Sequence, residues 1–335
     1  MERIVSGKIG KEELELDITL RPKTLDEFVG QNRLKEKLKV YVEAAKRRGE
    51  ALDHCLFYGP PGLGKTTLAH IIARELNVNI RTISGPSLEK IGDLAAILTN
   101  LETGDVFFID EIHRLKKNIE EALYLPLEDF RMDIVIGQGP SAKTMRLTLH
   151  PFTLIGATTK AGSISSPLRE RFGIVERIDY YPEEEIFLIL KRSARILSIK
   201  IHDDACMEIA KRSRGTPRIA NRILKRIRDW AEVKGKGEID MDAAINGLRM
   251  LDIDEEGLDE MDRRILLTII KDFNGGPVGI EAISANIGED IDTLSDIYEP
   301  YLLQKGFLVR TQRGRIATDK AYKHLGIKKY EDELF

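Results

Sequence analysis

Short apolar runs alternate with helical patterns along residues 1–180. The apolar runs are continuous rather than alternating, which is typical of parallel strands buried on both faces. They lie at residues 55–58, 105–111 and 152–159, and a further short strand is predicted at 79–83. Between them, apolar residues that recur every three or four positions predict helices at about 33–48, 66–76, 93–101 and 120–130. This alternation predicts an α/β fold with a parallel sheet.

From Pro182 onward the pattern is mostly helical. Helices are predicted at 183–196, 203–212, 216–231 and 241–251, and they would form a small bundle. After an acidic linker at 252–257 come helices at 258–273, 280–287 and 291–303, then paired strands at 306–311 and 315–318. Three helices followed by a two-stranded wing are typical of a winged helix-turn-helix. The expected domains are therefore an α/β domain (1–181), a small helical domain (182–252) and a winged-helix domain (253–335).

Residues 131–149 show the alternation of a β-hairpin on each side of a turn at 137–141. Ile134 and Ile136 are expected to face Met145, Leu147 and Leu149 across that turn. A two-stranded projection is rarely stable alone, so it must pack on its own domain or on a partner protein. The pattern leaves both roles open.

Composition describes an ordinary water-soluble protein, with 42% hydrophobic and 32% charged residues. Two cysteines without metal-ligand spacing, and the lack of a signal-peptide or membrane-span pattern, predict a cytoplasmic protein. A net charge of −3 gives no global attraction to nucleic acid, so any such binding needs a local basic patch.

Residues 301–325 supply such a patch, with six basic residues against one acidic residue. Arg310, Arg313 and Arg315 lie on or beside the predicted wing, where they would contact DNA phosphates or a minor groove. The alternative is a winged helix that binds other proteins.

The segment Gly59 to Thr66 matches G-x-x-x-x-G-K-[ST] between a predicted strand and a predicted helix. Glycines let backbone N–H groups curl around phosphate oxygens, and the helix N-terminus adds its positive dipole end. Lys65 would then reach the β- and γ-phosphates, and the Thr66 hydroxyl would ligate Mg²⁺. The segment predicts a nucleotide site.

Asp110 and Glu111 end the apolar run at 105–111, at the sheet edge where open α/β sheets bind ligands. Asp110 would hold Mg²⁺, directly or through water, and Glu111 would polarise the water that attacks the γ-phosphate. The alternative is an acidic turn that faces solvent.

Hydroxyls and arginines in three further segments are candidates for sensing the γ-phosphate. Thr158 and Thr159 end another apolar strand at the same predicted edge, although either could instead cap a turn. Arg169 and Arg171 follow in a short helix, as surface charges or as a finger offered to a neighbouring subunit. Arg218 lies in the first turn of a helix, where a cation opposes the helix dipole, so it is a candidate nucleotide contact.

These features together resemble the AAA+ ATPases, and five segments resemble the RuvB family of bacterial Holliday-junction branch-migration motors. The segments are GPPGLGKTTLAH (59–70), GDLAAILT (92–99), FIDEIHRL (108–115), RGTPRIANR (214–222) and GLDEMDRR (257–264). The resemblance implies an AAA+ P-loop domain, a helical lid and a C-terminal winged helix. It also implies a hexameric ring that encircles duplex DNA at Holliday junctions, uses ATP and Mg²⁺, and works with RuvA and RuvC.

The resemblance also assigns roles to residues. Leu20, Arg21 and Tyr181 would flank the adenine nucleotide, with its phosphates on Gly62, Lys65, Thr66 and Thr67. Asp110 and Glu111 would be the Walker B pair, Thr158 the first sensor, Arg218 the second sensor and Arg171 the trans-acting finger. Glu128, Asp129 and Phe130 match a further nucleotide contact, the 131–149 hairpin matches a RuvA-docking insertion, and Arg310 and Arg315 match DNA contacts.

The sequence departs from the family pattern at two places. Lys160 stands where the family usually has arginine, and Leu125-Pro126-Leu127 replaces a smaller segment before Glu128. The second departure puts the helix that leads into that nucleotide contact in doubt.

Two other protein classes carry similar motifs. A nucleotide-switched DNA-binding factor would bind particular sequences and hydrolyse ATP slowly, whereas a motor would be stimulated by any duplex. A clamp loader acts on a protein ring, and the basic winged helix argues against that class.

Overall fold

The structure is a computed structural model that describes residues 19–136 and 143–329. The chain divides into two compact units. One comprises Arg21–Tyr180, and the other comprises residues 181–329 together with residues 19–20. Each unit is described separately below.

The first unit is built on a five-stranded parallel sheet in the order β2-β3-β6-β1-β7. The strands are β1 (Cys55–Tyr58), β2 (Ile80–Ser84), β3 (Val106–Asp110), β6 (Thr153–Thr158) and β7 (Ile174–Arg177). The central strands β1, β3 and β6 are almost wholly buried, which explains their continuous apolar runs. The four predicted strands are confirmed. Strand β7 has no such run, because it lies at the sheet edge and is partly exposed.

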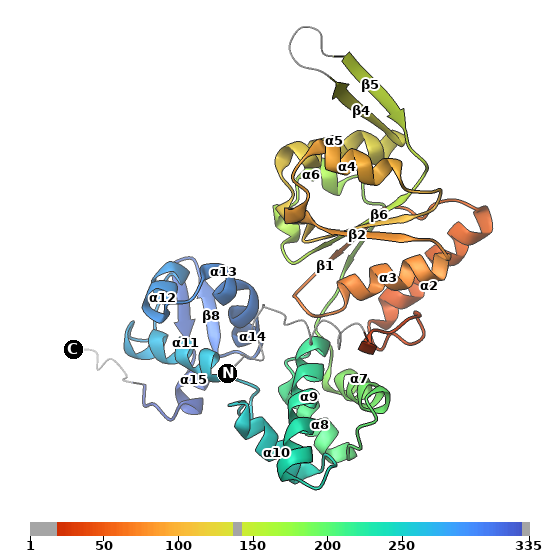
Figure 1. Cartoon of the computed structure of the whole chain (residues 1–335). Helices are drawn as coiled ribbons and strands as arrows, with labels where there is room; N and C mark the ends of the chain where they lie inside the picture. The colour runs from red at the N-terminus through yellow and green to blue at the C-terminus, as the bar shows by residue number, and fades with distance from the viewer. Residues whose placement is uncertain (1–18, 137–142, 330–335) are drawn as a thin grey trace. The chain divides into compact units, whose positions relative to one another are not determined.

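Helices cover both faces of the sheet (Figure 1). Helices α4 (Ile91–Thr99), α5 (Lys117–Asp129) and α6 (Ser166–Arg169) lie on one face, and α2 (Asn32–Arg48) and α3 (Lys65–Leu76) lie on the other. Gly49 caps α2 in the left-handed conformation, as its position after the apolar stripe predicts. Tyr41 is 38% exposed because it flanks the buried stripe of Leu34, Leu38, Val42 and Ala45.

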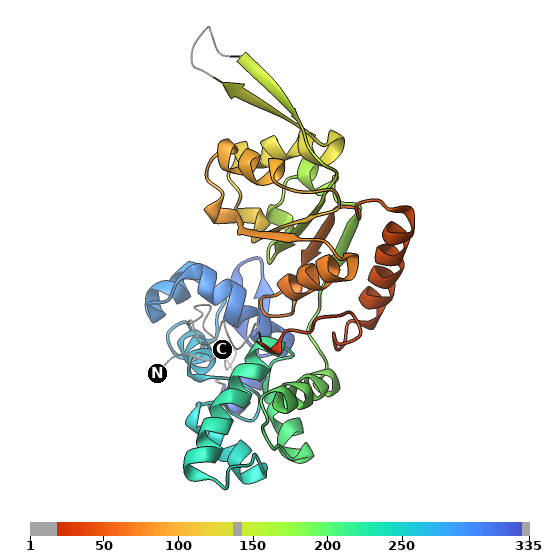
Figure 2. The ribbon, with the colours of Figure 1, turned by 45° about the vertical axis from the view of Figure 1, so that its right-hand side comes forward.

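The predicted hairpin is present as β4 (Arg131–Ile136) and β5 (Lys143–Thr148), and Figure 2 shows it projecting beyond the sheet. Ile134 pairs with Met145, and Met132 pairs with Leu147. Met132 is buried, whereas Met145 is 46% exposed, so the hairpin packs on its own domain only at its base. The turn predicted at 137–141 lies outside the described residues.

The second unit contains the helical lid and the winged helix. The lid comprises α7 (Glu183–Ile196), α8 (Asp203–Arg212), α9 (Pro217–Lys234) and α10 (Met241–Met250). The winged helix comprises α11 (Glu260–Lys271), α12 (Ile280–Ile287), α13 (Ile291–Thr293), α14 (Glu299–Gln304), β8 (Leu308–Thr311), β9 (Gly314–Ala317) and α15 (Asp319–His324). A π-helical turn, Leu294–Tyr298, joins α13 to α14, so the predicted helix at 291–303 is one continuous helical segment. The short α15 was not predicted.

The acidic linker predicted at 252–257 is ordered by hydrogen bonds within the segment. Asp254 donates its backbone N–H to the Leu258 carbonyl at 3.0 Å. Its carboxylate accepts from the backbone N–H groups of Glu256 at 3.0 Å and Leu258 at 2.9 Å. The Asp254 side chain therefore holds the segment in a tight turn. Within residues 19–136 and 143–329, none of the helices combines the length and apolar character that crossing a membrane requires.

Candidate nucleotide site and DNA-binding surface

The phosphate loop connects β1 to the first turn of α3. Gly59 has φ +143°, and a Cβ atom there would lie 2.2 Å from the Ile178 carbonyl oxygen, so a larger residue would displace the loop. Lys65 is 6% exposed and donates to the carbonyls of Gly59 and Pro60, both at 2.7 Å. The ammonium group is thus held within the loop at the N-terminus of α3, and the first N–H groups of a helix are suited to binding phosphate.

The carboxyl ends of β1, β3 and β6 meet at this loop because the three strands are parallel neighbours. Thr66 Oγ1 donates to Asp110 Oδ2 at 3.2 Å, which brings a hydroxyl and a carboxylate of two predicted Mg²⁺ ligands together. Hard oxygen ligands of this kind suit Mg²⁺, so the donor set fits the ion that the sequence predicts.

Glu111 directly follows β3 and has a positive φ of 51°, an uncommon backbone conformation for a residue with a side chain. Burial raises the pKa of its carboxyl, the Asp110 carboxylate raises it further, and Lys65 partly opposes both effects. A carboxylate of raised pKa is a better acceptor for a proton from water. Glu111 therefore has the environment that its predicted role requires.

The two threonines at the end of β6 contact different partners. Thr158 is fully buried, and its Oγ1 lies 2.9 Å from His113 Nδ1 and accepts from the Lys160 N–H at 2.9 Å. Thr159 Oγ1 donates to Glu111 Oε2 at 3.4 Å. Both hydroxyls therefore lie in the cluster at this edge, and which of them senses the phosphate stays a prediction.

His113 also belongs to this cluster, although the sequence predicted no role for it. Its Nδ1 lies 3.2 Å from Glu111 Oε2 and also meets Thr158, so it bridges the acid and the hydroxyl. The sequence feature that could have indicated a role for His113 is its position two residues after Glu111, in the same motif.

Arg171 and Glu128, which were predicted separately, form an ion pair. Arg171 Nη2 lies 2.9 Å from Glu128 Oε2, and the guanidinium lies over the Tyr124 ring with its carbon 4.6 Å from the ring centroid. Arg171 also donates to the carbonyls of Tyr124 at 3.3 Å and Pro167 at 2.6 Å. Asp129 is exposed, whereas Phe130 packs edge-on against Phe152 with centroids 5.9 Å apart. Pro126 lies inside α5, so the helix before Glu128 persists despite its unusual sequence.

Three further predicted residues belong to the second unit. Arg218 lies in the first turn of α9, after Pro217. Tyr181 is buried and donates its backbone N–H to the Gly215 carbonyl at 2.9 Å, and Leu20 accepts from Arg192 Nη1 at 2.7 Å. Arg21 and the loop residues Gly62 and Thr67 belong to the first unit. The nucleotide contacts of these residues stay predictions.

The wing separates its three arginines into two environments. Arg310 and Arg313 are exposed, but Arg315 is 8% exposed. Arg315 forms a two-bond ion pair with Glu299 of α14, with Nε–Oε1 at 2.8 Å and Nη2–Oε2 at 2.9 Å. Such bidentate pairing fixes a guanidinium strongly. This geometry favours a structural role for Arg315 and leaves Arg310 and Arg313 as the accessible cations of the wing.

Comparison with known proteins covers the same three regions. Residues 20–178 match the Holliday junction DNA helicase RuvB P-loop domain, residues 181–254 the RuvB AAA lid domain, and residues 255–326 the RuvB C-terminal winged helix domain. Among solved structures, the Thermotoga maritima RuvB Holliday junction branch migration motor is 56% identical, with a TM-score of 0.85. A point mutant of Thermotoga maritima RuvB is 57% identical, with a TM-score of 0.86. Each alignment covers 92% of this chain and 99% of the other. The chain therefore belongs to the RuvB family of AAA+ ATPases.

Proposed function

We propose that this protein is an ATP-driven motor that moves the branch point of Holliday junctions in homologous recombination and DNA repair. The carrying observation is the convergence of Lys65, Thr66, Asp110 and Glu111 at one sheet edge, in a chain that also has a basic winged helix. The family match over all three regions supports the same conclusion.

The residues at the sheet edge would divide the chemistry between them. Lys65 neutralises charge on the β- and γ-phosphates, while Thr66 and Asp110 hold Mg²⁺, which when bound screens the phosphate charge. The Glu111 carboxylate would accept a hydrogen bond from the attacking water and then take the proton that this water loses. Thr158 or Thr159 would contact the γ-phosphate. The hydrogen bond of Thr159 to Glu111 would link this contact to the activation of water by Glu111.

Further nucleotide contacts are proposed on the lid and at the subunit boundary. Arg218 would bind the γ-phosphate from the lid, and Leu20, Arg21 and Tyr181 would flank the adenine. Glu128, Asp129, Phe130 and Arg171 would be offered to an adjacent subunit of a hexameric ring. The pairing of Arg171 with Glu128 supports a shared surface for these residues. We propose domains at 1–181, 182–252 and 253–335, and a cytoplasmic location.

We further propose that the 131–149 hairpin binds RuvA and that RuvC acts on the same junction. The projection of the hairpin and the exposure of Met145 support a partner contact. Met145→Glu is expected to abolish stimulation of branch migration by RuvA and to leave the ATP turnover of the free protein unchanged. Stimulation equal to wild type would contradict the docking role.

The motor function is tested by ATP-dependent branch migration of a synthetic four-way junction with Mg²⁺ and RuvA. Lys65→Ala is expected to lower the rate by about 10²-fold or more, because it removes a charge that stabilises the transferring phosphate. Lys117→Ala is a matched control, since that side chain is 90% exposed. The proposal would be contradicted if Lys65→Ala drove branch migration at the rate of the control. It would also be contradicted if duplex DNA did not change the ATP turnover of the wild-type protein.

A further inference from the structure

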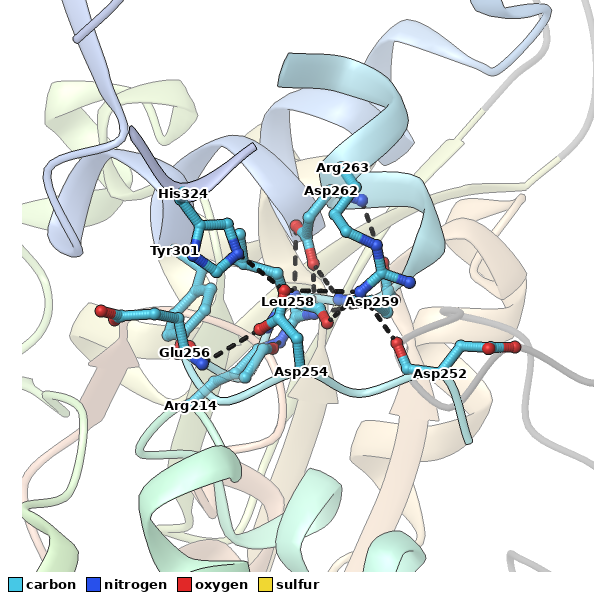
Figure 3. Close-up of polar contacts among 11 residues, drawn as sticks. Arg214, Asp252, Asp254, Glu256, Leu258, Asp259, Asp262, Arg263, Tyr301 and His324 are labelled. Carbon is cyan, nitrogen blue, oxygen red and sulfur yellow. Dashed lines mark hydrogen bonds and ion pairs between the residues drawn. The ribbon is translucent and has the colours of Figure 1, made fainter. Parts of the chain in front are cut away.

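Two of the segments that characterise the sequence, 214–222 and 257–264, meet in the second unit without contributing to the sheet-edge cluster (Figure 3). Arg214 lies in the loop before α9, four residues before Arg218, and it is 4% exposed. Its backbone has a φ of +55°. The guanidinium points away from its own domain and into the start of the winged helix.

The partners of Arg214 all belong to the segment that begins the winged helix, or to its core. Arg214 Nε donates to the Gly257 carbonyl at 3.0 Å, and Nη1 donates to Asp262 Oδ1 at 3.4 Å. Nη2 also donates to Asp262 Oδ2 and lies 3.6 Å from Asp259 Oδ2. The guanidinium carbon lies 4.7 Å from the centroid of the Tyr301 ring. One side chain therefore contacts the entry, the first helix and the third helical segment of the winged helix.

The acids that receive Arg214 also begin α11. Asp259 donates its backbone N–H to Asp262 Oδ2 at 2.9 Å, and Asp262 donates its own to Asp259 Oδ1 at 3.0 Å. This reciprocal capping fixes both carboxylates relative to the helix axis. Asp262 is fully buried. The hydrogen bonds that start α11 therefore also fix the orientation of its carboxylate.

The turn at 252–258 encloses the arginine. Gly257 has φ +75°, and a Cβ there would lie 2.8 Å from the Tyr301 hydroxyl and 3.0 Å from the Arg212 carbonyl. Tyr301 donates to the Glu256 carbonyl at 2.5 Å. Asp254 contacts His324 Nε2 at 2.8 Å, and Lys320 Nζ donates to Glu256 Oε2 at 3.1 Å. These bonds tie the turn to α14 and α15 and leave it little freedom to act as a flexible linker.

The loop that carries Arg214 also leads directly into the Arg218 helix. Thr216 Oγ1 donates to the Arg214 carbonyl at 3.2 Å, and the Ala220 N–H donates to the Thr216 carbonyl at 3.0 Å. Tyr181, where the chain enters the lid, donates to the Gly215 carbonyl at 2.9 Å. The short segment between Arg214 and Arg218 is thus held in place by these three hydrogen bonds.

We propose that Arg214 is a positioning residue that locks the Arg218 segment to α11, so that nucleotide-dependent movement of the lid turns the winged helix as one body with it. The inference rests on the proposed function, in which Arg218 reads the nucleotide and the wing holds DNA. A buried ion pair is not needed for stability, since apolar residues of similar volume often serve equally well. Its directional bonds instead fix one orientation of two elements, which is what transmission of movement requires.

The test uses the full-length protein with the double substitution Arg214→Met and Asp262→Asn. This change removes both charges together and keeps an acceptor for the Asp259 N–H. ATP turnover without DNA and binding of duplex DNA are expected to stay within about twofold of wild type, because neither machinery is touched. The number of junctions migrated per ATP hydrolysed is expected to fall by about tenfold or more, as movement of the lid no longer turns the winged helix.

The matched control is Arg212→Met, which breaks a buried ion pair with Glu208 that lies wholly within α8 of the lid. It is expected to keep wild-type coupling. Backbone amide exchange at residues 254–262 supplies a readout besides activity, and it is expected to accelerate in the double variant and not in the control. Wild-type coupling and exchange in the double variant would overturn the inference.

If the double variant does not fold, two milder variants test the positioning role of Arg214. Arg214→Lys keeps the charge without the fork, and Tyr301→Phe keeps the ring without the bond to Glu256. Each is expected to lower coupling by about twofold to fivefold, because each removes part of the directional contact. Full coupling in both would overturn the inference. If the wild-type protein itself migrates no junction, the proposed function fails. Amide exchange at residues 254–262 would then still show whether Arg214 holds the start of the winged helix in place.

Discussion

At the scale of single residues, His54 occupies a fully determined position between β1, β6 and α5. Its Nδ1 accepts from the Leu154 N–H at 2.9 Å, and its Nε2 faces the Leu127 carbonyl at 3.0 Å. The ring must therefore be neutral with its proton on Nε2, because a proton on Nδ1 would face another donor. Burial lowers the pKa of His54 from its ordinary value of 6.5.

This environment predicts a dependence of stability on pH. Below pH 6.5 the unfolded chain binds a proton at His54 that the folded chain does not, so the free energy of unfolding falls as the pH falls. The loss is about 1.4 kcal/mol for each unit by which folding lowers the pKa. Urea unfolding at pH 7.5 and 5.5 should show this loss in wild type and a smaller one in His54→Gln. An equal loss in both proteins would contradict the assignment.

Glu111, Thr158 and His113 show what residue-level reasoning could and could not supply. The acid and the hydroxyl were predicted because each ends an apolar run, and parallel strands bring such ends to one edge. The bridging place of His113 was not predictable, because it depends on the short turn after Glu111 and on a strand 45 residues away in the sequence.

At the scale of elements, the wing shows how two paired strands can carry cations with different roles. Arg310 and Arg315 are directly paired across β8 and β9, yet Arg310 is exposed and Arg315 is bound to Glu299. Strand alternation could not distinguish them, because the difference comes from a glutamate on α14. Length and apolar pattern predicted the long helices well, whereas the short, polar β7 and α15 left too little pattern to detect.

The two environments predict different results for matched substitutions. Arg310→Gln is expected to reduce the salt dependence of duplex binding by about one phosphate contact and to leave the melting temperature unchanged. Arg315→Gln is expected to destabilise the winged helix by about 3 kcal/mol, because it leaves Glu299 buried without a partner. Fluorescence titration at several salt concentrations and thermal melting measure the two effects. An Arg315→Gln protein of wild-type stability with weakened DNA binding would favour direct DNA contact instead.

At the scale of the whole molecule, the proposed role of Arg171 requires a neighbouring subunit. Arg171 is held by Glu128, Tyr124 and Pro167 near the exposed end of α5. An arginine placed to complete the site of a neighbour would act across a subunit boundary, as arginine fingers do in related ATPases.

This arrangement predicts complementation between inactive subunits. Arg171→Ala and Lys65→Ala are each expected to lose about 10²-fold or more of ATP turnover alone. Mixing them should restore part of it, because an Arg171→Ala subunit retains its loop and receives a finger from a Lys65→Ala neighbour. Phosphate release by the mixture, with co-assembly checked by cross-linking, measures the effect. No recovery in co-assembled rings would exclude a finger in trans.

The sequence by itself determined the chemistry of this protein: the phosphate loop, the acidic strand end, the hydroxyl-tipped strand and the basic wing. These are local features, in which residue type, spacing and strand polarity are enough to state what can be bound. The tertiary structure alone decided which charged side chains are exposed and able to bind a ligand, and which are buried in ion pairs within the protein. Arg214 meets Asp262 over 48 residues of chain, and Arg315 is buried against Glu299. Such pairs depend on how distant elements pack, because burying a charge is tolerated only where folding brings it a partner.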